Sequence, residues 1–176
     1  VVRPDGSLWS AGNNNNGRLG DGTTEKRSTL VKVIDSGVDK VFSKGKYAAV
    51  IKEDGSLWTF GLNNQGQLGN GTQENSSVPV KIEASGVVDV SPFWEVTIYL
   101  KSDGSLWGMG KNHHGHLLQK TGGSLFSSPV KIVQSGVIKA SVGNHHLIYL
   151  KEGGSVWGKG SNLSGQLGQA SAEVYS

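Results

Sequence analysis

Short runs of alternating apolar and polar residues, separated by turn sequences, occupy most of this chain. One set of runs, at residues 30–34, 79–82 and 129–132, places a lysine between apolar residues, and a Ser-Gly pair follows each run. Alternation over about four to eight residues is typical of a half-buried β-strand. No segment sustains the helical apolar period of about 3.6 residues, so we expect no long helix.

A motif that recurs four times sets the period of the chain. It reads Asp-Gly-Ser-Leu-Trp at residues 54–58 and is followed by Gly-Gln-Leu-Gly at 66–69, with related copies beginning at residues 5, 103 and 153. The motif tryptophans are 49, 49 and 50 residues apart: Trp9, Trp58, Trp107 and Trp157. A fixed period of this size indicates a repeat architecture.

Each period contains four strand-like runs, which predicts an all-β fold. In the third unit the first three runs cover residues 87–90, 96–101 and 105–109. The fourth run, at 77–82 or its equivalent, gives the outermost strand. Asp-Gly between two such runs favours a hairpin, predicted here as a type I′ turn. Repeated sheets of four antiparallel strands are the blades of a β-propeller. The predicted blades cover residues 1–34 (partial), 38–82, 87–132 and 137–176 (partial).

Residues that recur in every unit are interpreted as structural. The motif tryptophans are expected to pack within or between blades. The motif glycines are expected to form turns: Gly6, Gly55, Gly104 and Gly154. A lysine on an edge strand prevents edge-to-edge pairing, and this is the role predicted for the recurring lysines, with phosphate binding as the alternative: Lys32, Lys81 and Lys131.

The chain shows no pattern typical of a catalytic or cofactor site. Asp5, Asp54 and Asp103 recur as turn residues, and the fourth copy is Gly153, so no unique acid emerges. We find neither a nucleophile with a base nor a pair of carboxylates. The glycine-rich loops lack the Gly-Lys-Ser/Thr sequence of a phosphate-binding loop. We therefore expect a protein that is not an enzyme and uses no cofactor.

Composition narrows the classes of partner. The net charge is +3 and the pI about 9.1, but the lysines recur once per unit and form no basic stripe with aromatics, which disfavours nucleic acid. No apolar run reaches the length of a membrane-spanning helix, so we expect no span. The absence of cysteine fits a cytosolic protein or an exported bacterial protein. Of these, an extracellular or cell-surface location is favoured.

The irregular loops are the predicted binding surface. Alternating strand directions place the connections between first and second strands, and between third and fourth strands, on one face. Variable loops on a rigid scaffold are where binding sites usually lie. Trp94 is the one tryptophan outside the motif and suits an interface anchor; packing under a loop is the alternative. The candidate binding residues are Lys44, Lys46, Phe93, Trp94, Glu95, His113, His114, Asn144 and His145.

Several histidines raise the question of a metal site. His113, His114 and His116 lie close together in the sequence, and His145 or His146 could join them. Sequence neighbours seldom converge on one ion, and no carboxylate or cysteine recurs beside them at ligand spacing. We therefore expect no metal.

The repeat resembles that of the regulator of chromosome condensation repeat family. The resemblance rests on the pattern D-G-S-L-W-x-x-G-x-N-x-x-G-x-L-G and on the segment at residues 141–150, and the period is most similar to short bacterial repeats. It implies a seven-bladed propeller, of which this chain holds about half. The chain begins inside a repeat, so we expect a fragment of a longer chain. Self-association through open blade faces is the lesser option.

The resemblance implies a binding function. Family members include a nucleotide exchange factor for a small GTPase that also docks on nucleosomes, and a secreted propeller that inhibits β-lactamases. The short repeats disfavour the exchange-factor interpretation. We expect a binding module that presents its loop face to a protein partner. The alternative is a surface or secreted domain that binds carbohydrate through aromatic residues such as Trp94.

Overall fold

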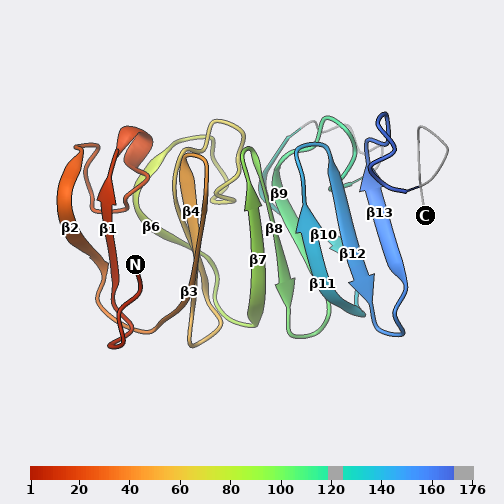
Figure 1. The fold of residues 1–176 in the computed structure, drawn as a ribbon, viewed down its shortest axis with the longest axis horizontal. Helices are drawn as coiled ribbons and strands as arrows, with labels where there is room; N and C mark the ends of the chain where they lie inside the picture. Colours follow the sequence, from red (N-terminus) through yellow and green to blue (C-terminus); the bar gives the residue numbers. More distant parts are fainter. Residues whose placement is uncertain (119–124, 169–176) are drawn as a thin grey trace.

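The chain forms four antiparallel β-sheets that stand side by side in chain order (Figure 1). The computed structural model describes residues 1–118 and 125–168. The strands are β1 (Leu8–Gly12), β2 (Arg27–Ile34), β3 (Val38–Lys44), β4 (Tyr47–Lys52), β5 (Leu57–Gly61), β6 (Ser76–Glu83), β7 (Val87–Phe93), β8 (Val96–Lys101), β9 (Leu106–Lys111), β10 (Leu125–Val133), β11 (Val137–Val142), β12 (His146–Lys151) and β13 (Val156–Gly160). A single turn of 3-10 helix, η1 (Asn15–Gly17), lies between β1 and β2.

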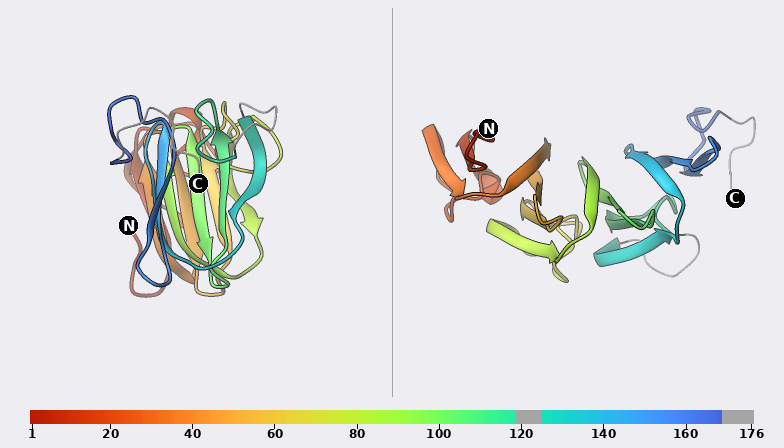
Figure 2. Two further views of the ribbon diagram at one scale, coloured as in Figure 1. Left: turned by 90° about the vertical axis from the view of Figure 1, so that its right-hand side faces the viewer. Right: turned by 90° about the horizontal axis from the view of Figure 1, so that it is seen from below.

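The strand order within the sheets is that of propeller blades. Two sheets are complete, with orders β3-β4-β5-β6 and β7-β8-β9-β10, and each places its fourth strand at an edge. Within the described residues the first sheet pairs β1 with β2, and the last contains β11, β12 and β13. Seen from below, the sheets follow one another along the molecule in chain order (Figure 2). The predicted all-β fold of repeated antiparallel blades is confirmed.

The turn type predicted for the Asp-Gly hairpins is wrong. A type I′ turn requires positive φ at both central residues, but φ is positive at Gly55 (74°) and not at Asp54. The Gly55 amide donates to the Lys52 carbonyl at 2.8 Å, and the Lys52 amide donates to the Ser56 carbonyl at 3.0 Å. This is a type I turn followed by a glycine bulge. The Asp54 carboxylate favours it by accepting the Ser56 N–H at 2.9 Å.

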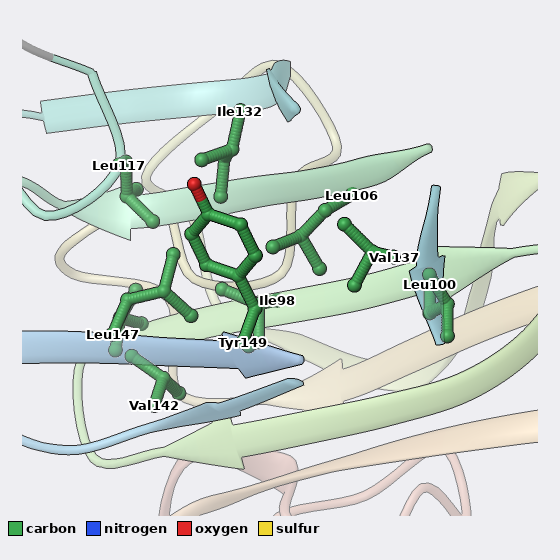
Figure 3. Close-up of a cluster of buried hydrophobic side chains, with 10 residues drawn as sticks. Ile98, Leu100, Leu106, Leu117, Ile132, Val137, Val142, Leu147 and Tyr149 are labelled. Atoms are coloured by element: carbon green, nitrogen blue, oxygen red, sulfur yellow. The ribbon is translucent and has the colours of Figure 1, made fainter. Parts of the chain in front are cut away.

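Each pair of neighbouring sheets buries a small apolar core. Between the third and fourth sheets, Leu147 and Tyr149 of β12 lie against Ile98 of β8, Ile132 of β10 and the loop residue Leu117 (Figure 3). Separate clusters fill the junction of the second and third sheets and that of the first and second. Because each sheet contacts only its neighbours, several small cores stabilise the repeat array in place of one large core.

The motif tryptophans are half-buried and bridge neighbouring strands. The Trp58 indole N–H donates to Ser56 Oγ at 2.9 Å. Lys81 of the edge strand β6 places its ammonium 5.1 Å from the centre of the Trp58 ring. Such a contact contributes about 0.5–1 kcal/mol at an exposed site. The arrangement recurs at Trp9 and Trp107, so the edge lysines also stabilise the blade.

A buried asparagine closes each of the described long loops that follow a third strand. Asn63 Oδ1 accepts the N–H of Leu68 at 2.9 Å, and both residues are fully buried. Asn112 bonds the amide of Leu117 in the same way at 2.8 Å. These loops and the β3–β4, β7–β8 and β11–β12 connections share one end of the sheets, at the top of Figure 1. Parts of the predicted loop 111–127 and of the predicted blade 137–176 lie outside the described residues.

The Tyr47 hydroxyl joins the second sheet to the third. It donates to the Val96 carbonyl at 2.7 Å and lies 2.9 Å from Thr97 Oγ1, and the Tyr47 side chain is fully buried. Tyr47→Phe leaves that buried carbonyl without this donor. We expect the free energy of unfolding to fall by about 1–2 kcal/mol, measured by urea denaturation. An unchanged midpoint would contradict a stabilising role for this bond.

Candidate functional site

Two tight connections, β7–β8 and β11–β12, border an open pocket on the loop side of the third and fourth sheets. Its volume is about 360 Å³. We call it the Trp94 pocket, and its lining residues are Phe93, Trp94, Glu95, Lys111, Asn144 and His145. All but Lys111 are candidates predicted from the sequence. The pocket therefore forms where the loops depart most from the repeat.

Trp94 occupies a backbone position that favours glycine. Its φ is 40°, and 55% of the residue is exposed. The left-handed region costs about 1–2 kcal/mol for a residue with a Cβ. Gly45, the counterpart in the preceding repeat, has φ 80° and lies beside the Trp94 indole: a Cβ at Gly45 would lie 3.6 Å from Trp94 Cε3. The β3–β4 connection therefore supports one side of the indole and leaves the rest exposed.

Positive charges outnumber negative charges around the Trp94 pocket. Glu95 Oε2 lies 2.6 Å from Lys111 Nζ, and the Lys111 amide donates to the Glu95 carbonyl at 2.9 Å. The ammonium of Lys44 lies 4.5 Å from the centre of the Phe93 ring. The one carboxylate that lines the pocket is therefore neutralised by an ion pair, whereas Lys44 adds a further positive charge.

Two histidines from different repeats meet at the pocket. The ring centres of His114 and His145 are 4.1 Å apart, with their planes tilted by 59°. His145 Nε2 is hydrogen-bonded to Asn144 Nδ2 at 2.9 Å, and the His145 carbonyl accepts the Ser161 N–H at 2.8 Å. Burial, then the charges of His145 and its other basic neighbours, lower the pKa of His114. Protonation of His114 is therefore disfavoured while no anion lies beside it.

His116 lies beneath this pair and was not among the predicted site residues. It is 1% exposed, and its ring nitrogens make no hydrogen bond within the described part of the chain. Burial, with smaller contributions from His114 and His145, lowers its pKa to about 4. A Cβ placed on Gly160 of β13 would lie 2.8 Å from the His116 Cβ. His116 is therefore part of the junction between the third and fourth repeats.

The other predicted residues lie outside the pocket lining. Lys46 is exposed in the β3–β4 connection, and His113 is exposed in the loop that follows β9. Lys111 lines the pocket but was not predicted as a binding residue. The second repeat has the apolar Leu62 at this position, and that difference could have identified Lys111 from the sequence. Within residues 1–118 and 125–168, no three or more His, Asp or Glu side chains are grouped so that they could hold a metal ion. No helix in those residues has the length and hydropathy needed to span a membrane.

One sequence repeat, which runs from β5 of the second sheet to β7 of the third, identifies the family of the motif. Residues 54–92 match the family model for the regulator of chromosome condensation (RCC1) repeat. This stretch is an RCC1 repeat. The resemblance predicted from the motif is therefore confirmed. A search of curated proteins found no significant match to the chain.

Solved structures of RCC1-type proteins share the fold. Human WBSCR16 superposes with a TM-score of 0.82 at 22% identity, over 92% of this chain and 44% of that one. Yeast RCC1 (Prp20), solved with Kap60, gives 0.76 at 15% identity over 96% and 43%. Prp20p from Saccharomyces cerevisiae, described together with its binding properties to Gsp1p and histones, gives 0.73 at 18% identity over 97% and 45%. The chain spans less than half the length of these proteins, and the likeness establishes the fold.

Proposed function

We propose that this chain is a protein-binding module without catalytic activity, and that its partner docks at the Trp94 pocket. The observation that carries the proposal is Trp94 itself. Its indole is exposed at a left-handed backbone position, where the neighbouring repeats have Gly45 and Asn144. Local strain of this kind is concentrated at functional sites. Tryptophan is also among the residues that contribute most to interface affinity.

Proteins of similar fold support a protein partner. Yeast RCC1 (Prp20) binds Kap60, and Prp20p is described with Gsp1p and histones. Because a fold does not determine its partner, none of these names is transferred to this chain.

Trp94→Gly tests the proposal without adding strain to the turn. Glycine is the residue that the second repeat has at this position, so we expect stability to be retained or to rise by about 1 kcal/mol. Loss of an interface anchor is expected to weaken binding by about 2 kcal/mol, or roughly 30-fold. The partner is captured from lysate by the wild-type chain, purified, and titrated against both proteins by calorimetry.

A matched control and a second ligand class make the test decisive. Val78→Ala removes another exposed apolar side chain, on β6, and is expected to leave the affinity unchanged. A glycan array is probed in parallel with the wild-type chain and with Trp94→Gly. Glycan binding that is lost in Trp94→Gly contradicts the proposal of a protein partner. Partner binding that is equal in the wild-type chain and Trp94→Gly contradicts the docking site.

A further inference from the structure

The charges at the Trp94 pocket specify the chemistry of its ligand. Glu95 is the only carboxylate among the lining residues, and its oxygen is held by Lys111 at 2.6 Å. Lys44 lies over the adjacent Phe93 ring, and Lys46 follows on the same exposed turn. A ligand that enters the pocket therefore meets a surplus of positive charge beside an exposed indole.

The His114–His145 pair makes that surplus dependent on pH. The two rings are 4.1 Å apart, so a proton on one ring repels a proton on the other. Among the described residues, the charged and titratable groups beside the pair are Glu95, Lys111, His113, His116 and His146. Glu95 is the single acid among them, and Lys111 already neutralises it. Within residues 1–118 and 125–168, His114 therefore has no unpaired carboxylate beside it that would stabilise its protonated form.

We infer that the partner inserts an acidic peptide segment into the Trp94 pocket, and that its binding is coupled to proton uptake by the His114–His145 pair. The inference rests on the proposed function and names the chemistry of its partner. A ligand carboxylate near the pair supplies the missing anion and accepts hydrogen bonds from the imidazolium N–H groups. An apolar residue next to that carboxylate packs on the Trp94 indole.

Coupling of this kind is reciprocal. If the carboxylate raises the pKa of His114, protonation must strengthen binding by the same factor. The burial and repulsion that lower the pKa of His114 in the free protein leave room for such a rise. His116 lies deeper, with a pKa of about 4, and stays neutral across the neutral range. The proton-dependent part of binding therefore belongs to the His114–His145 pair.

The test uses the full chain and a synthetic probe. The probe is a fluorescein-labelled peptide of aspartate and glutamate around one leucine, and its control has asparagine and glutamine in place of the acids. Fluorescence anisotropy is measured between about pH 6 and pH 8 at constant ionic strength, a window in which histidine changes charge. We expect roughly tenfold tighter binding at the lower pH. The neutral control peptide is expected to bind weakly and without a pH dependence.

Glutamine substitutions assign the effect to the pair. His114→Gln introduces the residue that the second repeat has at this position, Gln65. His114→Gln and His145→Gln are each expected to bind the acidic peptide with the same affinity at every pH in this window. That affinity is expected to be close to the affinity of the wild-type chain at about pH 8. His116→Gln, which introduces the counterpart of Gln67, is expected to retain the wild-type dependence. NMR titration is expected to show a higher pKa for His114 in the presence of the acidic peptide than in its absence.

Each contrary result has a distinct meaning. A pH dependence that persists when both His114 and His145 are glutamine contradicts the coupling. Tighter binding of a single-stranded DNA of equal charge contradicts the choice of a peptide. An acidic peptide that fails to bind at any pH contradicts the inference as a whole. In that last case, a captured partner that still requires Trp94 leaves the proposed function standing, whereas one that binds Trp94→Gly equally well contradicts the proposed function alone.

Discussion

Gly55→Ala is expected to lower the free energy of unfolding by about 3 kcal/mol or more, through backbone strain and overpacking together. Gly55 has φ 74°, in the left-handed region where an alanine is strained. A Cβ at this position would also lie 2.7 Å from the amide nitrogen of Gly86, in the connection that leads to the next blade. Moving that backbone away would break the bond from the Val87 amide to the Gly55 carbonyl, which is 2.9 Å long. Urea denaturation followed by tryptophan fluorescence measures the loss.

The fourth repeat supplies the matched control for this prediction. Gly154 occupies the equivalent position with φ 87°, after Gly153 (φ 86°) in place of Asp54, and a Cβ there meets no atom within 4 Å in the described residues. Gly154→Ala therefore carries the backbone strain without the contact between blades, and we expect a loss of only about 1–2 kcal/mol. Equal losses at the two positions would show that the close approach at Gly86 contributes nothing.

The fold could be predicted from the sequence because its determinants are local and repeated. Alternation indicated the strands, and the tryptophan period indicated the blades. The turn type at Asp54-Gly55 was missed, because the Asp54 side chain bonds the Ser56 amide and stabilises a geometry that the dipeptide alone does not specify. The role predicted for Lys81 was incomplete for a related reason. Its contact with Trp58 joins two strands whose register the sequence does not state.

The candidate site could be predicted only where it breaks the repeat. Trp94 stood out because its counterparts are Gly45 and Asn144, and the structure places it beside the first of these. The meeting of His114 with His145 depends on how the loop of one blade packs on the turn of the next, which no local pattern encodes. The blades thus act as a uniform scaffold, and departures at equivalent positions create the pocket.

His116 is one such departure, and it makes the stability of the chain depend on pH. Its pKa is about 4 in the folded chain, against an ordinary value of 6.5. Between these values the unfolded chain binds a proton that the folded chain does not, so stability falls as the pH is lowered from 6.5 towards 4. The full loss from this group is about 3 kcal/mol. Urea denaturation at a series of pH values measures it.

His116→Gln is the variant that assigns this pH dependence to one side chain. The second repeat buries Gln67 at the same position, where Gln67 Oε1 accepts the Gln65 N–H at 2.9 Å, so glutamine suits the site. We expect the variant to lose most of the slope above pH 4. Asp21, whose pKa is about 2 because bonds from Arg27 and other neighbours outweigh its burial, affects stability only below its ordinary value of 3.8. Because the lowered pKa of His114 also contributes in this range, only a slope in His116→Gln as steep as that of the wild-type chain would place the buried proton site elsewhere.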